Sequence, residues 1–507
     1  MVADHGAICS AAVSLERQAT AGAAWSIATA LGTRVLGLVG TVALTHWLDP
    51  ALIGEVENAA VLVVTASGFS NLGLAQYLVA YPKSGRAVAF HVTLFQLLCA
   101  LFALAVAVAV AGPLGGLVKT PAMVRYVVPL AVALLIERIG LVPWTLLMRD
   151  LRFRRLGLIR SLGEVAFTTV AVALAATGSG GMAIVWANLV RYGLTTTLFV
   201  SSVKTSEWLH PAPLDRATTR TLLAYGLPLW IASITGFGSR RWDNSIVSAL
   251  FGPQVAGLYK QAYNLADIPA TQVGEQLGEV LLPSFSRLDP VRRPAALLRA
   301  TGLIALLITP LAIGLGAVAP TLTRAILPPA WSGVAPLLVA LSVLSVVRPI
   351  GWTIGAYLQA VGRTRPVMAL EVARLLLLLA AIATLGRWGP LWVCVAVGLA
   401  FGAQALLAAL VVRGPELPLH RFAAALGRPL LATVPMVLTV LAVRAALLRL
   451  GLGGRLLPLV VEIAVGALAY VPAALLVAPQ SARDLVGLGR GLLRRRRDGD
   501  GAGDASD

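Results

Sequence analysis

Arginines inside long apolar stretches are the residues of this sequence best suited to binding a ligand. The stretch 22–48 contains Arg34 near its middle and no other Lys, Arg, Asp or Glu. About 25 helical residues span a hydrocarbon core of ~30 Å, which places Arg34 near the midplane. An arginine there costs ~2.5–3.5 kcal/mol on insertion scales, so it needs water, a partner or a ligand. Comparable mid-stretch positions hold Arg191, Arg240, Arg241 and Arg348.

These five arginines are predicted to bind a phosphate-containing ligand. A guanidinium pairs bidentately with phosphate oxygens, and cations outnumber acids at this depth of the predicted spans. A diphosphate is therefore an anion that such a lining suits. The alternative is that each arginine is neutralised by an acid within the protein. Close spacing along a helix suggests such pairs for Arg160 with Glu164, Arg374 with Glu371, and Asp243 with Arg240.

Two acidic residues, Asp267 and Glu275, are candidates for binding a coupling ion or proton. Pairing with nearby arginines, or a position close to the membrane interface, is the competing interpretation. No catalytic residues, cofactor or metal site are predicted. The three cysteines are far apart and have no CxxC or Cys/His spacing, which indicates neither a disulfide framework nor a zinc site.

The composition predicts an all-α integral membrane protein. Of 507 residues, 58% are hydrophobic and 13% charged, whereas soluble domains carry about 25% charged residues. Apolar runs between short polar breaks indicate about 14 helices. They cover 22–48, 55–82, 87–112, 123–148, 154–177, 181–201, 220–250, 254–286, 296–319, 333–360, 366–386, 389–412, 428–448 and 456–478.

The distribution of loop arginine and lysine predicts the orientation in the cytoplasmic membrane. Most of these residues lie on the side of the N-terminus, so the positive-inside rule places both termini in the cytoplasm with an even number of spans. The same residues account for much of the formal net charge of +18. A nucleic-acid partner is therefore not predicted.

A weak internal repeat divides the chain into two halves. The segment 47–54, which ends the first span, contains Pro50 and Gly54, and the segment 250–257, which ends the seventh span, contains Pro253 and Gly257 at the same spacing. Copies six helices apart enter from the same side, which predicts a parallel pseudo-two-fold. The predicted segments are 1–21, cytoplasmic; 22–201, a six-helix bundle; 202–219, a cytoplasmic linker; 220–413, a second six-helix bundle; 428–478, two additional helices; and 479–507, a basic and then Gly/Asp-rich tail.

Three stretches resemble the oligosaccharide flippases of the polysaccharide transporter family. This family belongs to the multidrug/oligosaccharidyl-lipid/polysaccharide exporter superfamily. The likeness covers roughly residues 17–413. It is carried by Ala24-Trp25 through Leu48-Asp49-Pro50-x-x-Ile53-Gly54; by Leu147-Met148-Arg149-Asp150-Leu151-Arg152-Phe153-Arg154-Arg155; and by Tyr225-Gly226-Leu227-Pro228 with Phe251-Gly252-Pro253-x-x-Ala256-Gly257-Leu258-Tyr259.

The resemblance implies a transporter rather than an enzyme. It implies two bundles around a central cavity and alternating access that moves a polyprenyl-pyrophosphate-linked oligosaccharide, such as an undecaprenyl-pyrophosphate-linked glycan, for surface or exopolysaccharide synthesis. Membrane lipids and a polysaccharide polymerase complex are the other expected partners. Two alternatives stay open: a cation-coupled multidrug exporter of the same fold, and a membrane glycosyltransferase or polymerase. The basic spans disfavour the first, and the short outer loops disfavour the second.

Overall fold

The computed structural model describes residues 32–485 apart from 34, 71, 73, 82–84, 151, 214 and 452–453. Within helices it leaves out some side chains, including those of 268–280. Every regular element in the described part is a helix, and eleven of these helices are long and apolar enough to cross a membrane. The prediction of an all-α membrane protein is therefore confirmed. The prediction of 14 spans stays a prediction, because α8 and α9 carry more charge and the first span is only partly described.

The chain forms two compact units, Met1–Lys260 and Gln261–Asp507, so the division falls inside α9. The predicted domain boundaries, which place a linker at 202–219, stay a prediction. The first unit contains the helix Val35–Leu44 and then α2 (Pro50–Ser70), α3 (Leu74–Ala80), α4 (Gly85–Leu117), α5 (Val124–Arg149), α6 (Phe153–Ala176), α7 (Met182–Ser201), α8 (Arg216–Phe251) and the start of α9 (Pro253–Arg287).

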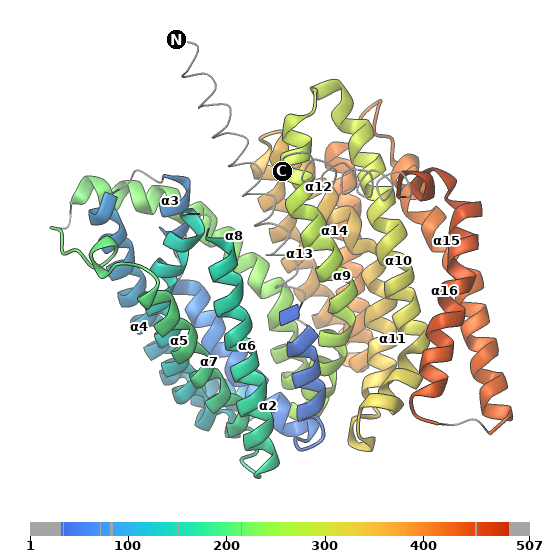
Figure 1. Ribbon diagram of the computed structural model, residues 1–507, viewed down its shortest axis with the longest axis horizontal. Helices are drawn as coiled ribbons and strands as arrows, with labels where there is room; N and C mark the ends of the chain where they lie inside the picture. Colours follow the sequence, from blue (N-terminus) through green and yellow to red (C-terminus); the bar gives the residue numbers. More distant parts are fainter. Residues whose placement is uncertain are drawn as a thin grey trace, which may run out of the picture. The chain divides into compact units, whose positions relative to one another are not determined.

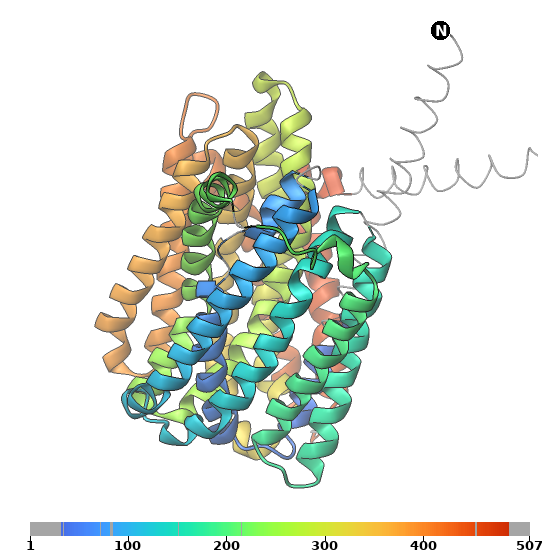
Figure 2. The same ribbon diagram turned by 90° about the vertical axis from the view of Figure 1, so that its left-hand side faces the viewer.

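Helix α2 is central to the first unit because it packs against α4, α5 and α8. Helices α5, α6 and α7 lie side by side, as Figures 1 and 2 show from two directions. Apolar side chains of α2, α4, α5 and α7 form a core cluster with Met123 of the turn before α5, and Met123 and Val127 are fully buried. Charged side chains on these helices must therefore pair with one another or line a cavity.

The break between α8 and α9 has a local cause in the dipeptide Gly252-Pro253. Gly252 adopts a φ of +86°, a left-handed conformation that glycine reaches without a Cβ penalty and that commonly ends a helix. Pro253 follows as the first residue of α9, where its missing N–H leaves no hydrogen bond unmade. This turn fixes the position of Gly257, one turn into α9.

The second unit contains the rest of α9 and a series of further helices. They are α10 (Arg293–Ile326), α11 (Val334–Leu344), α12 (Arg348–Ala360), α13 (Thr364–Leu385), α14 (Pro390–Val412), α15 (Leu419–Arg449) and α16 (Leu457–Val477). Helix α14 packs against α11, α12 and α13. Helices α10, α15 and α16 pack against one another, and their labels lie together in Figure 1.

A buried carboxylate fastens the last two helices to α10. Glu462 of α16 is 0% exposed, and its Oε1 accepts hydrogen bonds from Thr321 Oγ1 at 2.8 Å and from Arg444 Nε at 3.0 Å. Arg444 Nη2 lies 2.7 Å from Glu462 Oε2 and also donates to the carbonyl of Ala317. The ion pair of α15 and α16 is thus also hydrogen-bonded to α10, and it lies among apolar contacts between these three helices.

Replacing Glu462 with alanine is expected to destabilise the protein by about 3–5 kcal/mol, because it leaves the half-buried Arg444 without its carboxylate. Thermal unfolding of the purified variant in detergent measures this loss. Glu416→Ala, at an exposed acid in the loop before α15, is the matched control and should change stability by less than about 0.5 kcal/mol. Equal stability of the two variants would contradict the fastening role of Glu462.

Candidate functional site

The two copies of the sequence repeat meet in the structure. Gly54 of α2 faces the start of α9, where a Cβ built on it would lie 2.0 Å from the carbonyl oxygen of Pro253. Gly257 of α9 faces the start of α2 in the same way, with its built Cβ 1.9 Å from the carbonyl oxygen of Pro50. The contact is reciprocal, as a local two-fold requires. Only glycine allows the two backbones to approach this closely.

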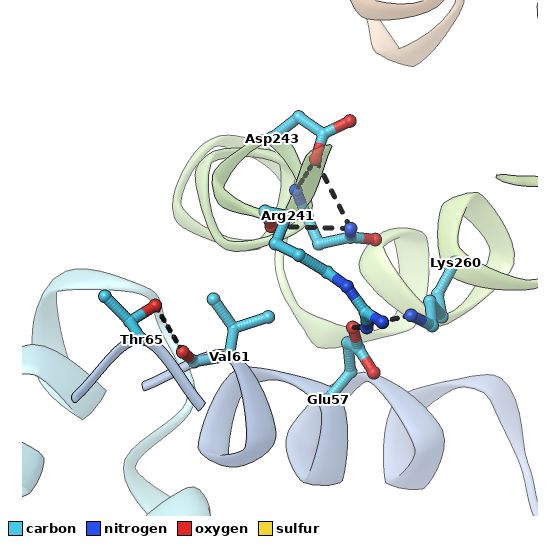
Figure 3. A network of polar contacts seen from close by, with 7 residues as sticks. Glu57, Val61, Thr65, Arg241, Asp243 and Lys260 are labelled. Carbon is cyan, nitrogen blue, oxygen red and sulfur yellow. Dashed lines mark hydrogen bonds and ion pairs between the residues drawn. The ribbon is translucent and has the colours of Figure 1, made fainter. Parts of the chain in front are cut away.

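An ion-pair cluster lies one helical turn beyond these glycines. Glu57 and Lys260 each stand three residues after a repeat glycine, and Glu57 Oε1 lies 2.7 Å from Lys260 Nζ. Both side chains are 13% exposed. Arg241 of α8 adds a longer contact of 3.5 Å between its Nη1 and the same Glu57 oxygen (Figure 3). We call these three residues the junction cluster.

Further polar contacts surround the junction cluster. Asn58 Nδ2 donates to Ser248 Oγ at 2.7 Å and to Thr120 Oγ1 at 3.0 Å, which links α2 to α8 and to the turn before α5. The buried Asp243 accepts a hydrogen bond of 2.7 Å from Tyr259 Oη. Asp243 therefore bonds to α9, whereas the sequence suggested that it would lie near Arg240.

Arg240 and Arg241 are neighbours in sequence, yet they have different surroundings. Arg240 is exposed, and its Nε donates to the carbonyl of Gly236 one turn earlier at 3.1 Å. The Arg241 side chain is 48% exposed, so its contact with Glu57 is largely screened by solvent. Lys260 is therefore the cation that contributes most to the junction cluster.

A second charged site lies among α5, α6 and α7. A cavity of about 450 Å³ is lined by two arginines, two glutamates and several aromatic and hydroxyl side chains. Arg191 Nη1 lies 3.1 Å from Glu164 Oε2, with the glutamate side chain 10% exposed. The guanidinium of Arg160 stacks over the ring of Trp144 at 5.2 Å. The suggested pair of Arg160 with Glu164 is thus replaced by a pair between helices, Arg191 with Glu164.

The first described helix reaches the edge of this α5–α7 cavity. Thr33 and Gly37 line it, and Thr33 Oγ1 lies 2.9 Å from Ser161 Oγ of α6. A Cβ built on Gly37 would lie 2.7 Å from Glu164 Oε1, so this helix and the Arg191–Glu164 pair are in close contact. Arg34 lies outside the described residues, and its phosphate-binding role stays a prediction.

Arg348 belongs to the second unit and is paired with an acid there. Its side chain is 6% exposed, and its Nη1 lies 2.5 Å from Asp267 Oδ1. The guanidinium also stacks over the ring of Phe401 at 4.4 Å. Arg348, which was predicted to bind phosphate, and Asp267, which was predicted to bind a coupling ion, thus form an ion pair with each other. The side chain of Glu275 lies outside the described part of the chain, and all of these roles stay predictions.

A neighbouring network in the second unit contains the pair that helix spacing suggested. Arg374 bonds to Glu371 one turn earlier, and Gln404 of α14 bridges both residues. Gln404 accepts from Arg374 Nη1 at 3.2 Å and donates to Glu371 Oε1 at 3.0 Å. The guanidinium of Arg374 lies 5.1 Å from the centre of the Phe401 ring, so this ring contacts the guanidinium groups of both Arg348 and Arg374.

Helix spacing did not predict that Arg191 pairs with Glu164, Arg241 with Glu57 or Arg348 with Asp267. Those partners are 27, 184 and 81 positions away in the chain, beyond the reach of helix spacing. A signal for Glu57 and Lys260 was nevertheless present, since each lies three residues after a repeat glycine. Among the described residues, no group of three or more His, Cys, Asp or Glu is placed to hold a metal ion.

The fold and these sites define a class, the multi-pass all-helical membrane proteins with ion pairs inside their spans. A family model described as "Polysaccharide biosynthesis protein" matches residues 43–336, and the chain belongs to this family.

The chain is similar to two characterised proteins and to a solved structure. It is 24% identical over 384 residues to the lipopolysaccharide biosynthesis protein WzxC of Escherichia coli (strain K12), covering 74% of this chain and 76% of that protein. It is 24% identical over 344 residues to the succinoglycan biosynthesis transport protein ExoT of Rhizobium meliloti (strain 1021), covering 67% and 68%. The structure of the lipid II flippase MurJ in an inward closed conformation aligns with a TM-score of 0.72 at 14% identity, covering 90% of this chain and 98% of that one. This last likeness shows the fold.

Proposed function

We propose that the chain is a flippase that moves a polyprenyl-pyrophosphate-linked oligosaccharide across the cytoplasmic membrane by alternating access. The family match over residues 43–336 carries this proposal, together with relatives named for lipopolysaccharide biosynthesis and succinoglycan transport. The family and these relatives favour a transporter over an enzyme. The fold, which resembles that of a lipid II flippase, agrees with the proposal.

The α5–α7 cavity is our candidate for the pyrophosphate contact in the first unit. Its described lining holds two arginines and two glutamates, so its charge is balanced rather than basic. In this proposal the diphosphate replaces Glu164 as the ion-pair partner of Arg191, because phosphate offers more acceptor oxygens to a guanidinium than one carboxylate does. After release, Glu164 recaptures Arg191 and lowers the affinity for the departing ligand.

The pair of Arg191 and Glu164 gives two variants with opposite expected effects on substrate binding. Arg191→Gln should weaken binding of a polyprenyl pyrophosphate about tenfold or more, since charge-assisted hydrogen bonds contribute about 1.5–3 kcal/mol. Glu164→Gln should strengthen binding, because it removes the competing carboxylate. Native mass spectrometry of the purified variants with added lipid measures both effects.

Arg125→Gln, at an exposed arginine of α5, is the matched control and should bind like the wild type. If both cavity variants bind as the control does, the cavity is not the pyrophosphate site.

The junction cluster is our candidate for a contact that opens during alternating access. It joins the starts of α2 and α9, which belong to the two repeat copies. Any motion that separates these helix ends must break the Glu57–Lys260 pair and expose both charges to water. A half-buried ion pair suits this role because hydration of the separated charges offsets part of its loss.

Deletion of the gene tests the proposed function directly. We expect loss of a surface or secreted polysaccharide, restored by the wild-type gene, with accumulation of the lipid-linked oligosaccharide in the inner leaflet. Drug susceptibility should stay unchanged. Normal polysaccharide together with increased drug susceptibility would instead support a multidrug exporter of the same fold.

We also propose that both termini lie in the cytoplasm, from the loop arginines and lysines on the side of the N-terminus. Reporter fusions to each end of the full chain test this orientation. A polysaccharide polymerase complex is the proposed protein partner, and co-purification from cells that make the polysaccharide tests it.

A further inference from the structure

A basic cavity lies in the second unit, apart from the sites described above. It has a volume of about 590 Å³ and is lined by the N-terminal parts of α10 and α15 and by residues that follow α16. Four arginines line it, namely Arg299, Arg421, Arg428 and Arg483. A volume of this size is ordinary for sites that bind small molecules, about 300–1,000 Å³.

One acid, Asp484, neutralises one of these arginines. Asp484 Oδ1 lies 2.5 Å from Arg299 Nη2, and Oδ2 accepts from Arg299 Nε at 3.1 Å. These hydrogen bonds hold the pKa of the Asp484 carboxyl below its ordinary value, so it stays ionised near neutral pH. The cavity therefore keeps an excess of positive charge from the three other arginines.

The remaining arginines are available to an anion. All three are exposed, and in the described part of the chain none forms an ion pair with a carboxylate. Arg421 Nη1 makes a 3.4 Å contact with the carbonyl oxygen of Glu416, which leaves its charge uncompensated. Converging guanidinium groups of this kind suit a phosphate group, which accepts several charge-assisted hydrogen bonds at once.

The surface next to the cavity indicates which kind of molecule carries the phosphate. Immediately after Arg428, helix α15 presents an outward apolar stripe of Leu431, Val434 and Leu438, which are 62%, 50% and 62% exposed. In a bilayer such a stripe contacts acyl chains, while arginines at the end of the same helix reach the headgroup level. A phospholipid can contact the arginines with its phosphate and the apolar stripe with its acyl chains, whereas a soluble phosphate can contact the arginines alone.

We propose that the cavity formed by Arg421, Arg428 and Arg483 binds the phosphate of an anionic phospholipid whose acyl chains lie along α15. This site is separate from the α5–α7 cavity and does not depend on the transported substrate. Its occupant is a resident membrane lipid, and its effect is to hold α10, α15 and the segment after α16 together.

Native mass spectrometry of the full chain in detergent, titrated with phosphatidylglycerol or phosphatidylcholine, tests the site. The double variant Arg428→Gln with Arg483→Gln is expected to bind phosphatidylglycerol about 30-fold more weakly than the wild type, with phosphatidylcholine binding unchanged. The matched control is Arg363→Gln with Arg365→Gln, which removes two exposed arginines elsewhere in the unit and should bind like the wild type.

Arg421→Gln is a second variant, expected to weaken binding about fivefold, and it keeps the test decisive if the double variant does not purify. Unchanged phosphatidylglycerol binding in these variants, or equal weakening in the control, overturns the proposal. Inorganic phosphate that displaces phosphatidylglycerol at equal concentration would also overturn it, because the site would then bind the anion without the lipid.

Discussion

Gly54→Ala and Gly257→Ala are each expected to reduce polysaccharide export to less than about a tenth of the wild-type level. A Cβ at either position would lie 1.9–2.0 Å from a backbone carbonyl oxygen, and no side-chain rotation relieves a contact with backbone. The starts of α2 and α9 must therefore move apart. We expect a loss of about 3 kcal/mol, at the upper end of the range for overpacked sites. Export assays in the deletion strain and thermal unfolding of the purified variants measure the two effects.

Gly68→Ala is the matched control for this pair, because it lies on the same helix α2 and a Cβ there meets no atom within 4 Å. It should export normally and gain slightly in stability, since alanine favours the helix by about 1 kcal/mol over glycine. If Gly54→Ala and Gly257→Ala export as well as Gly68→Ala does, the close contact of the repeat copies is not needed for function.

Breaking the Glu57–Lys260 pair has the second large expected effect. Glu57→Gln and Lys260→Gln should each destabilise the protein by about 3–5 kcal/mol, because each leaves a half-buried charge without its partner. The double variant should recover more than half of that loss, since neither charge then remains. A double-mutant cycle from thermal unfolding gives the coupling energy. Export should stay impaired in the double variant if the pair also holds one conformation of the transport cycle.

The pair of Glu55 and Arg125 supplies the control for this cycle. It lies on α2 and α5 at 2.9 Å, but the Arg125 side chain is 54% exposed. Glu55→Gln should therefore cost less than about 1 kcal/mol, as solvent-exposed ion pairs do. Additive effects of Glu57→Gln and Lys260→Gln, with losses no larger than that of Glu55→Gln, would contradict a specific pair.

The fold class and the family could be predicted from local features of the chain. The apolar runs predicted an all-α membrane protein, which the helices confirm. The motifs around Pro50 and Pro253 contributed to the predicted family, and the match over residues 43–336 confirms that family. The pair of Arg374 with Glu371 was predictable because i,i+3 residues share a helix face. The phosphate-binding arginines and the coupling-ion candidates stay predictions.

The sequence alone determined that this protein spans a membrane, that it is helical, and where charged residues lie within its apolar segments. These properties depend on hydropathy and on residues close together in the chain. The tertiary structure decided the partners of the charges: Glu164 for Arg191, Asp267 for Arg348, and Glu57 for Lys260. A side chain pairs with what packing brings within a few ångströms, and helix packing joins positions that are up to 203 residues apart. The contact of Gly54 with Pro253 likewise follows from two helices meeting, which no local spacing encodes.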